Sequence, residues 1–180
     1  IDHLSTLGSL DNAMRLSSAR AQTGLKRLNT QPALGGTPLT QDTVLPETLT
    51  PVPALASGYV QIINMATLHD RAGERSTVYV TKRPGSFVLE GTTLAEVSGP
   101  LRQENLDPLS RCFVIGDQRT DEQDPELGLL TLSEISSKAL SPGVNDPGTA
   151  VEVISRVASL LWGYARHRPT ENAPDFARVF

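Results

Sequence analysis

Side chains able to do chemistry gather in two polar segments of the sequence, residues 116–125 and residues 141–150. The candidate ligand-binding residues in these segments are Arg119, Thr120, Gln123, Asp124, Ser141, Asn145, Asp146 and Thr149. Around them the sequence contains no nucleophile elbow, phosphate loop, dinucleotide fingerprint or zincin helix. Because nothing in their spacing demands acid–base chemistry, we assign no catalytic residue.

Arg119 is the candidate anion-binding residue of the first segment. Its guanidinium can clamp a carboxylate or a phosphate through two parallel N–H bonds. The same group can instead pin Asp121, Asp124 or a loop carbonyl, and we favour this structural role. A hydrolase-like enzyme built on Arg119, Asp124 and Asp146 stays an alternative, which requires the three side chains to converge on one cleft.

The second segment leads into a predicted helix at Asp146-Pro147, and Asp124-Pro125 in the first segment has the same pattern. An aspartate at the N-cap accepts bonds from free backbone N–H groups, and a proline at the next position sacrifices no helical bond. Free N–H groups and a positive helix end can also capture an anion, so a small-ligand sensor using residues 141–150 is a second alternative. The Asp146 carboxylate would occupy that anion position, which favours a turn with an N-cap.

Metal, cofactor and redox chemistry find little support in the sequence. None of the histidines His3, His69 and His167 has a second His or Cys at metal-ligand spacing, so we predict no metal site and no cofactor. Cys112 is the only cysteine and cannot form an intramolecular disulfide. Its apolar neighbours in residues 113–115 predict a buried, structural side chain.

Composition describes an ordinary globular chain of 180 residues, with 38% hydrophobic and 20% charged residues. Sixteen Lys and Arg stand against 20 Asp and Glu, a formal net charge of −4, without a dense basic tract. This charge balance disfavours nucleic-acid binding and a broad electrostatic contact with anionic lipid. No apolar run is long enough to cross a bilayer.

Four segments differ in their residue patterns. Apolar residues at helical spacing predict an N-terminal helix, and a proline- and threonine-rich stretch after it predicts an extended linker. Short strands separated by glycine turns come next, followed by two helices around one strand at 113–116. The predicted divisions are 1–28 for the N-terminal helix, 29–57 for the linker, 58–106 for the β module and 107–180 for the helical hairpin module.

The glycine-turned strands at residues 83–97 resemble half of a barrel-sandwich hybrid, the fold of lipoyl and biotinyl carrier domains. Those carriers present a modifiable lysine on the hairpin that follows. Residues 98–103 contain no lysine here, and Lys82 lies before the glycine turn. We therefore expect neither lipoyl nor biotin attachment.

Three segments together resemble a known bacterial family, the predicted membrane proteins grouped as domain of unknown function 2254. The segments are Ser57–Gln61, Arg83–Gly91 and Gly116–Ala150, in which the most specific string is Ser141-Pro142-Gly143-Val144-Asn145-Asp146-Pro147. The resemblance implies several transmembrane helices upstream of Ile1, in a bacterial inner membrane, with this part on the cytoplasmic side. It supplies no established catalytic residues, and residues 29–57 are the least typical stretch.

The sequence predicts an α+β fold, with a small β-sandwich or barrel-sandwich-like sheet, a packed helical hairpin and an N-terminal helix. We interpret the chain as a soluble regulatory or assembly domain of a multi-pass membrane protein, a channel or transporter being one such protein. A non-enzymatic role is favoured over an enzyme. The N-terminal helix has an apolar stripe and is separated by a long linker, which favours self-association into a homo-oligomer.

Overall fold

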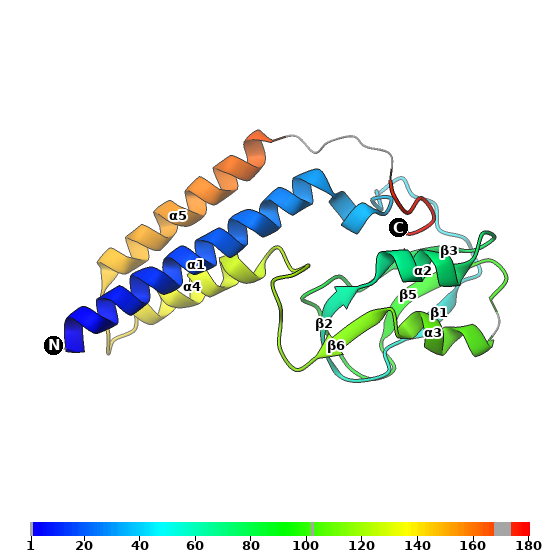
Figure 1. Cartoon of the computed structure of the whole chain (residues 1–180), viewed down its shortest axis with the longest axis horizontal. Helices are drawn as coiled ribbons and strands as arrows, with labels where there is room; N and C mark the ends of the chain where they lie inside the picture. Colours follow the sequence, from blue (N-terminus) through cyan, green and yellow to red (C-terminus); the bar gives the residue numbers. More distant parts are fainter. Residues whose placement is uncertain (1, 102, 168–173) are drawn as a thin grey trace. The chain divides into compact units, whose positions relative to one another are not determined.

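The computed structural model describes residues 2–101, 103–167 and 174–180. The fold is α+β, as predicted. The chain divides into two compact units (Figure 1). The helical unit comprises Ile1–Thr30 and Pro125–Pro169, and the β unit comprises Gln31–Asp124 and Thr170–Phe180.

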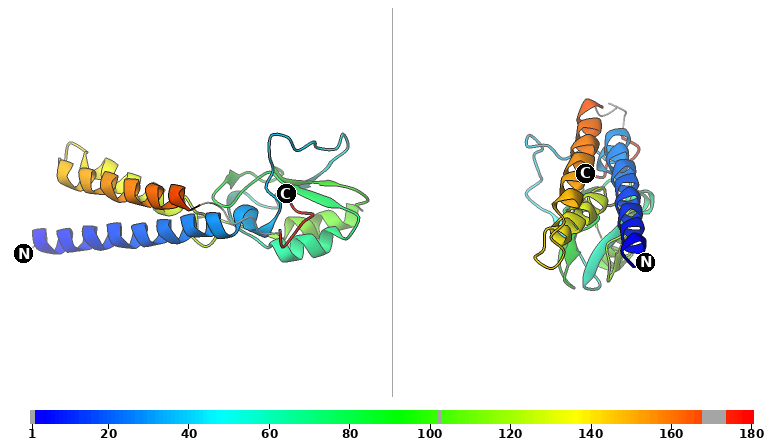
Figure 2. Two further views of the ribbon diagram at one scale, coloured as in Figure 1. Left: turned by 90° about the horizontal axis from the view of Figure 1, so that it is seen from above. Right: turned by 90° about the vertical axis from the view of Figure 1, so that its left-hand side faces the viewer.

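The helical unit consists of α1 (Asp2–Thr30), α4 (Leu127–Ala139) and α5 (Pro147–Arg166), which lie side by side (Figures 1 and 2). Its core forms where apolar side chains at helical spacing on each helix meet. Met14, Leu132 and Val153 are buried there, and the partly buried side chains around them are those of Leu10, Ile135, Val157 and Leu160. Among the side chains that the structure describes, each of the three helices contributes one buried residue to this cluster.

Glycines allow α1 and α4 to approach closely. A Cβ atom on Gly128 of α4 would lie 2.5 Å from the backbone nitrogen of Ala21 and 2.7 Å from the carbonyl oxygen of Ser17. A Cβ atom on Gly24 of α1 would lie 2.7 Å from Cα of Pro125. Glycine lowers helix propensity, but here it permits backbone contacts that any side chain would prevent.

The β unit contains two antiparallel sheets. In one, the order is β1 (Thr50–Pro53), β5 (Thr93–Ser98) and β3 (Thr77–Val80); in the other it is β4 (Phe87–Val88), β2 (Gly58–Ile63) and β6 (Phe113–Gly116). The helices of this unit are α2 (Met65–Ala72) and α3 (Leu106–Ser110), with 3₁₀ turns at Pro32–Gly35 and Gln103–Asn105. The sheets do not close into a barrel, and the barrel-sandwich likeness stays a prediction.

One hydrophobic core serves both sheets of the β unit. Its fully buried side chains include Val52, Val78 and Leu94 from one sheet and Val60 and Val88 from the other, with Leu68 and Leu109 from the helices. Cys112 is buried in this core as predicted, and burial raises the pKa of its thiol while nearby Arg71 acts in the opposite direction. The β unit therefore has a core of its own, although Val44, Phe87 and Leu89 remain exposed.

A strand forms inside the stretch that the proline content predicted to be an extended linker. β1 carries Pro51 and Pro53 and pairs with β5 at the edge of its sheet. An edge strand tolerates proline because the missing N–H can face away from the neighbouring strand. Residues 37–49, before this strand, form no helix or strand.

The last residues of the chain lie beside β3, in the β unit. The N–H of Val78 donates to the carbonyl of Arg178 at 2.9 Å, and the N–H of Phe180 donates to the carbonyl of Val78 at 2.8 Å. Val179, between them, is fully buried in the shared core. The segment 107–180 therefore contributes to both units.

Candidate functional site

Arg119 and Asp124 form a shielded ion pair in the loop that follows β6. Nε of Arg119 lies 2.6 Å from Oδ2 of Asp124, whose side chain is 2% exposed. Gly85, in the turn before β4, has a φ of +87°, and a Cβ atom on it would lie 2.5 Å from that same Oδ2. The turn at residues 83–86 therefore packs directly on the ion pair, and only glycine fits there.

Asp124 was expected to cap a helix, and this prediction is wrong. α4 begins at Leu127, and Glu126 occupies the N-cap position without a side-chain capping bond. The Asp124 carboxylate is engaged with Arg119 instead. A buried carboxylate needs a charged partner more than a helix start needs a cap, because leaving the charge unpaired costs more.

Gln123 fastens the same loop to β2. Its Oε1 accepts from the N–H of Ile63 at 2.8 Å, and its Nε2 donates to the carbonyl of Ile63 at 3.2 Å. Gln61 strengthens the attachment, because its Nε2 donates to the carbonyl of Gln118 at 2.7 Å. The side-chain amide of Gln123 thus makes the hydrogen bonds that a neighbouring strand would make. These bonds and that of Gln61 hold the loop against the sheet.

Thr120 lies in this loop with its hydroxyl oxygen buried. Within the described residues, that oxygen has no hydrogen-bond partner. The described residues also contain no group of three or more His, Cys, Asp or Glu arranged to hold a metal ion.

Asp146 caps α5, as predicted. Its Oδ1 accepts from the backbone N–H of Thr149 at 3.1 Å, and its Oδ2 accepts from the Thr149 hydroxyl at 2.6 Å. Pro147 occupies the first helical turn. The hydroxyl of Thr149 and then its N–H lower the pKa of Asp146 most, burial opposes them, and the N–H of Gly148 lowers the pKa by a smaller amount. The carboxylate occupies the helix end where an anion would bind.

Ser141 and Asn145 shape the turn between α4 and α5. The Ser141 hydroxyl donates to the carbonyl of Lys138 at 2.7 Å, and the Ser141 carbonyl accepts from the N–H of Asn145 at 2.8 Å. Asn145 adopts a φ of +46°, a left-handed conformation that asparagine tolerates better than most residues.

The candidate residues therefore form two separate groups. Arg119, Thr120, Gln123 and Asp124 belong to the β unit, while Ser141, Asn145, Asp146 and Thr149 belong to the helical unit. Asp124 and Asp146, the acids of the hydrolase hypothesis, each bind a partner within their own unit.

An exposed apolar surface on α5 is the feature that the sequence did not single out. Val151 and Ile154 are 62% and 63% exposed, and Leu161 and Trp162 are 46% and 67% exposed. We call this surface, with Ala158 and Ala165, the outer face of α5. The apolar positions of α5 span roughly 200° of the helix circumference, whereas one buried stripe needs only about 100°. That excess width was the signal available in the sequence.

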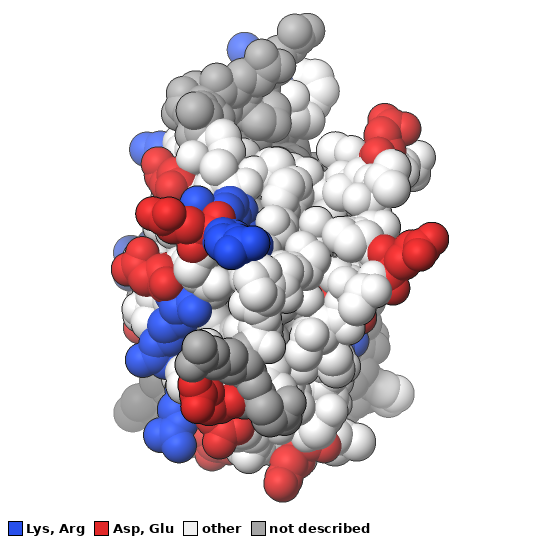
Figure 3. Space-filling view, turned by 90° about the vertical axis from the view of Figure 1, so that its right-hand side faces the viewer, with Lys and Arg blue, Asp and Glu red and all other residues white. Residues whose placement is uncertain are grey.

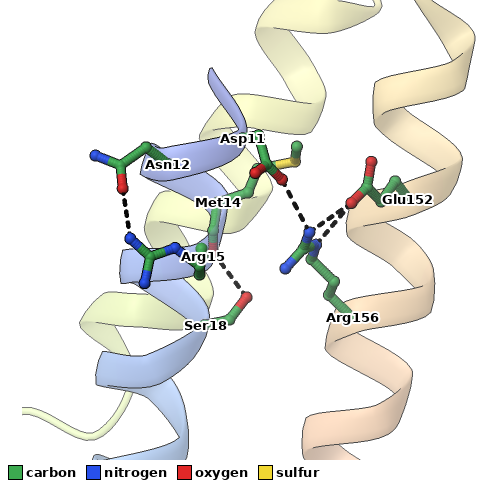
Figure 4. A network of polar contacts seen from close by, with 7 residues as sticks. All are labelled: Asp11, Asn12, Met14, Arg15, Ser18, Glu152 and Arg156. Carbon is green, nitrogen blue, oxygen red and sulfur yellow. Dashed lines mark hydrogen bonds and ion pairs between the residues drawn. The ribbon is translucent and has the colours of Figure 1, made fainter. Parts of the chain in front are cut away.

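The charged side chains in the middle of α5 lie on another side of the helix, toward α1. Arg156 contacts Glu152 one turn away and reaches Asp11 of α1 at 3.2 Å (Figure 4). These contacts keep both charges away from the outer face. The helix thus has an apolar face that packs in the unit, polar contacts with α1, and the exposed apolar outer face.

On the surface of the β unit, charges of both signs are intermixed. Figure 3 shows acidic and basic side chains interspersed along one side, beside a broad uncharged area. Neighbouring charges of opposite sign cancel at a distance, so this face offers no continuous field of one sign.

Comparison with known proteins identifies the family. The family described as "Predicted membrane protein (DUF2254)" matches residues 1–178. The chain belongs to this family. None of the described helices combines the length and the apolar character that crossing a bilayer requires.

Proteins similar to this chain occur among mycobacteria. Uncharacterized proteins of Mycobacterium bovis (strain ATCC BAA-935 / AF2122/97) and Mycobacterium tuberculosis (strains CDC 1551 / Oshkosh and ATCC 25618 / H37Rv) are each 30% identical over 118 residues. The alignment covers 61% of this chain and 23% of each relative. The chain thus spans about a quarter of their length. No solved structure matches the chain.

Proposed function

We propose that this chain is an assembly and regulatory domain on the cytoplasmic side of a multi-pass bacterial membrane protein of the channel or transporter class. Family membership supports the membrane setting. The polar residues of the two candidate sites support a non-catalytic role, because they hold loops and helix ends in place. A lone, buried cysteine is compatible with a reducing compartment.

The observation that carries the assembly role is the outer face of α5. A helix in a self-contained domain buries one apolar stripe and exposes polar residues on the rest of its surface. On α5, exposed large apolar side chains continue beyond the buried stripe, from Val151 to Trp162. Contiguous exposed apolar surface of this kind marks an interaction site in soluble parts of proteins.

Removal of the chain from the complete membrane protein tests the assembly role. We expect the intact protein, extracted in a mild detergent, to be an oligomer by native mass spectrometry. The protein truncated before Ile1 should lose copies or become monomeric. An unchanged copy number after truncation would show that assembly occurs elsewhere.

Cysteine labelling tests the side of the membrane. Ser137 is an exposed residue of α4, so a Ser137→Cys variant offers a reactive thiol, whereas native Cys112 is buried and serves as the internal control. A membrane-impermeant maleimide should label this variant only after the cells are opened. Labelling of intact spheroplasts would place the domain on the opposite side.

The alternative role as a small-ligand sensor can be tested directly. A thermal-shift screen against nucleotides, carboxylates and divalent ions examines the sensor role of residues 141–150, since a ligand that binds the folded state raises the melting temperature. The occupied helix end at Asp146 leads us to expect no shift. A ligand whose effect disappears in Thr149→Val would instead favour the sensor.

A further inference from the structure

We infer that the outer face of α5 binds the outer face of α5 from a second copy of this chain, antiparallel and crossing at Ala158. The inference rests on the proposed assembly function and names its partner and its surface. The residues of the seam are Val151, Ile154, Ala158, Leu161, Trp162 and Ala165.

The spacing of the outer face is that of a helix–helix seam. Val151, Ile154, Ala158, Leu161 and Ala165 follow one another at intervals of three, four, three and four residues. This repeat places apolar side chains along one line on a helix and is the pattern of paired helices. The core positions of the unit, such as Val153 and Val157, form a different line on α5. The seam is therefore additional to the packing already present.

Charge favours another apolar helix over a lipid surface as the occupant. The seam itself contains no charged residue, so two copies meet without repulsion. Interfacial membrane helices flank their apolar face with Lys and Arg, which bind anionic headgroups. On α5, Arg156 is instead engaged by Asp11 and Glu152, and Arg166 lies in the last turn.

The available area suits a two-fold contact. From the exposed fractions of its large side chains, the outer face presents roughly 500 Å² of apolar surface, near the upper limit for a stable monomer. Two copies that cover one another bury about 1,000 Å², the lower bound for a specific interface. Self-pairing therefore covers the face with an area of the size that a specific dimer requires.

An antiparallel arrangement matches large side chains with small ones. With the crossing at Ala158, Val151 lies opposite Ala165 of the second copy, and Leu161 lies opposite Ser155. Ile154 then meets Trp162, and the two Ala158 residues allow the helices to approach closely. Antiparallel dipoles attract, and the same surface serves on both copies, as in most protein dimers.

A charge placed in the seam tests the surface. Light scattering of the 180-residue chain should give a dimer mass for the wild type, and Ile154→Glu should raise the dissociation constant at least about 100-fold. Ser159→Glu is the matched control, since Ser159 is exposed on the same helix outside the seam and should leave the constant within about threefold. A monomeric wild type, or equal losses in both variants, would overturn the inference.

Trp162 supplies an independent readout because it is the only tryptophan in the chain. Its fluorescence should move to longer wavelength on dilution, as the dimer dissociates, and should not move when phosphatidylglycerol vesicles are added to the dimer. A monomer whose Trp162 emission shifts to shorter wavelength only with vesicles would identify a lipid surface as the occupant, against the inference.

Disulfide trapping tests the orientation. Val151→Cys chains mixed with Ala165→Cys chains should form a covalent heterodimer when copper phenanthroline and oxygen accept the two electrons and two protons lost by the thiols. Each variant alone should remain unlinked, and Cys112 is buried in the core. Efficient linkage of Val151→Cys to itself would mean a parallel pair and would refute the antiparallel seam.

Failure of the inference and failure of the proposed function give different results. If the complete protein loses its oligomer on truncation before Ile1 but keeps it in Ile154→Glu, the assembly function stands and the α5 seam is wrong. If truncation leaves the oligomer intact, the assembly function itself is wrong.

Discussion

The described apolar residues of the two units form cores of very different size. The β unit buries side chains from both sheets, two helices and the last residues of the chain in one continuous core. In the helical unit, the described core is centred on Met14, Leu132 and Val153, while Ile154 and Trp162 remain well exposed. Burial of apolar surface is the main favourable term in folding. The β unit therefore holds the larger of the two described cores, and the exposed outer face of α5 is the feature on which the proposed assembly rests.

The polar contacts of the two units also differ in how deeply they are buried. In the β unit, Arg119, Gln123 and Asp124 tie a loop to the sheet beneath Gly85, deep enough for the partners to depend on one another. In the helical unit, Asp146 and Arg156 lie nearer the surface and stabilise a helix end and a helix pair. Losses of polar contacts should therefore be large in the β unit and small in the helical unit.

Asp124→Ala should have the largest effect. It leaves the Arg119 guanidinium without its carboxylate in a shielded position, and breaking such a pair costs about 3 kcal/mol of unfolding free energy. Urea unfolding followed by circular dichroism measures the loss. Glu122→Ala, at an exposed position two residues away, should change the free energy by less than about 0.5 kcal/mol. Equal effects would mean that the Arg119–Asp124 ion pair contributes little to the stability of the β unit.

Gly128→Ala should have the second largest effect on stability, and it tests how closely α1 and α4 pack in the helical unit. The added methyl meets the backbone of Ser17 and Ala21, which cannot rotate away, so we expect a loss of about 2 kcal/mol. Gly163→Ala on α5 is the matched change, because nothing lies within 4 Å of its Cβ position. It should stabilise the chain by about 0.5–1 kcal/mol through helix propensity. Thermal unfolding of both variants gives the comparison, and a stabilised Gly128→Ala would show that α1 and α4 pack loosely.

Local patterns predicted much of this fold. β2 at Gly58–Ile63, β6 at Phe113–Gly116 and the start of α5 at Asp146-Pro147 follow from short apolar runs beside glycine and from an N-cap with proline. These signals are contained within a few residues, so they do not depend on distant parts of the chain.

Features that depend on distant residues were not predictable in this way. β1 was missed because its prolines argue against a strand, and only its place at a sheet edge removes the conflict. Asp124 looked identical to Asp146 in its local sequence, and the difference comes from Arg119 and from the approach of Gly85. The positions of Gly24 and Gly128 likewise become understandable only from the contacts of their backbones.

The smallest expected effect is a pH-dependent loss of helix content at the cap of α5, which lies in the helical unit. Bonds from Thr149 lower the pKa of Asp146 below its ordinary value of 3.8. A lowered carboxyl pKa contributes stability above the ordinary value, and this contribution is lost as the pH falls through the folded-state value. Wild-type helix content should therefore decline, as the pH falls from 5 to well below the ordinary value of 3.8, more than that of Asp146→Asn, because asparagine caps equally well without titrating.

Circular dichroism of the two proteins at both pH values, with Asp146→Ala as a third, measures this cap separately from other carboxyl groups. Asp146→Ala should show lower helix content at pH 5 and little further decline, since it has no cap to lose. The acid response shared by all three proteins then belongs to other carboxyl groups, including those of the β unit, and only the difference reports on α5. If Asp146→Asn declined as steeply as the wild type, the Asp146–Thr149 contact would contribute no measurable stability to the helical unit.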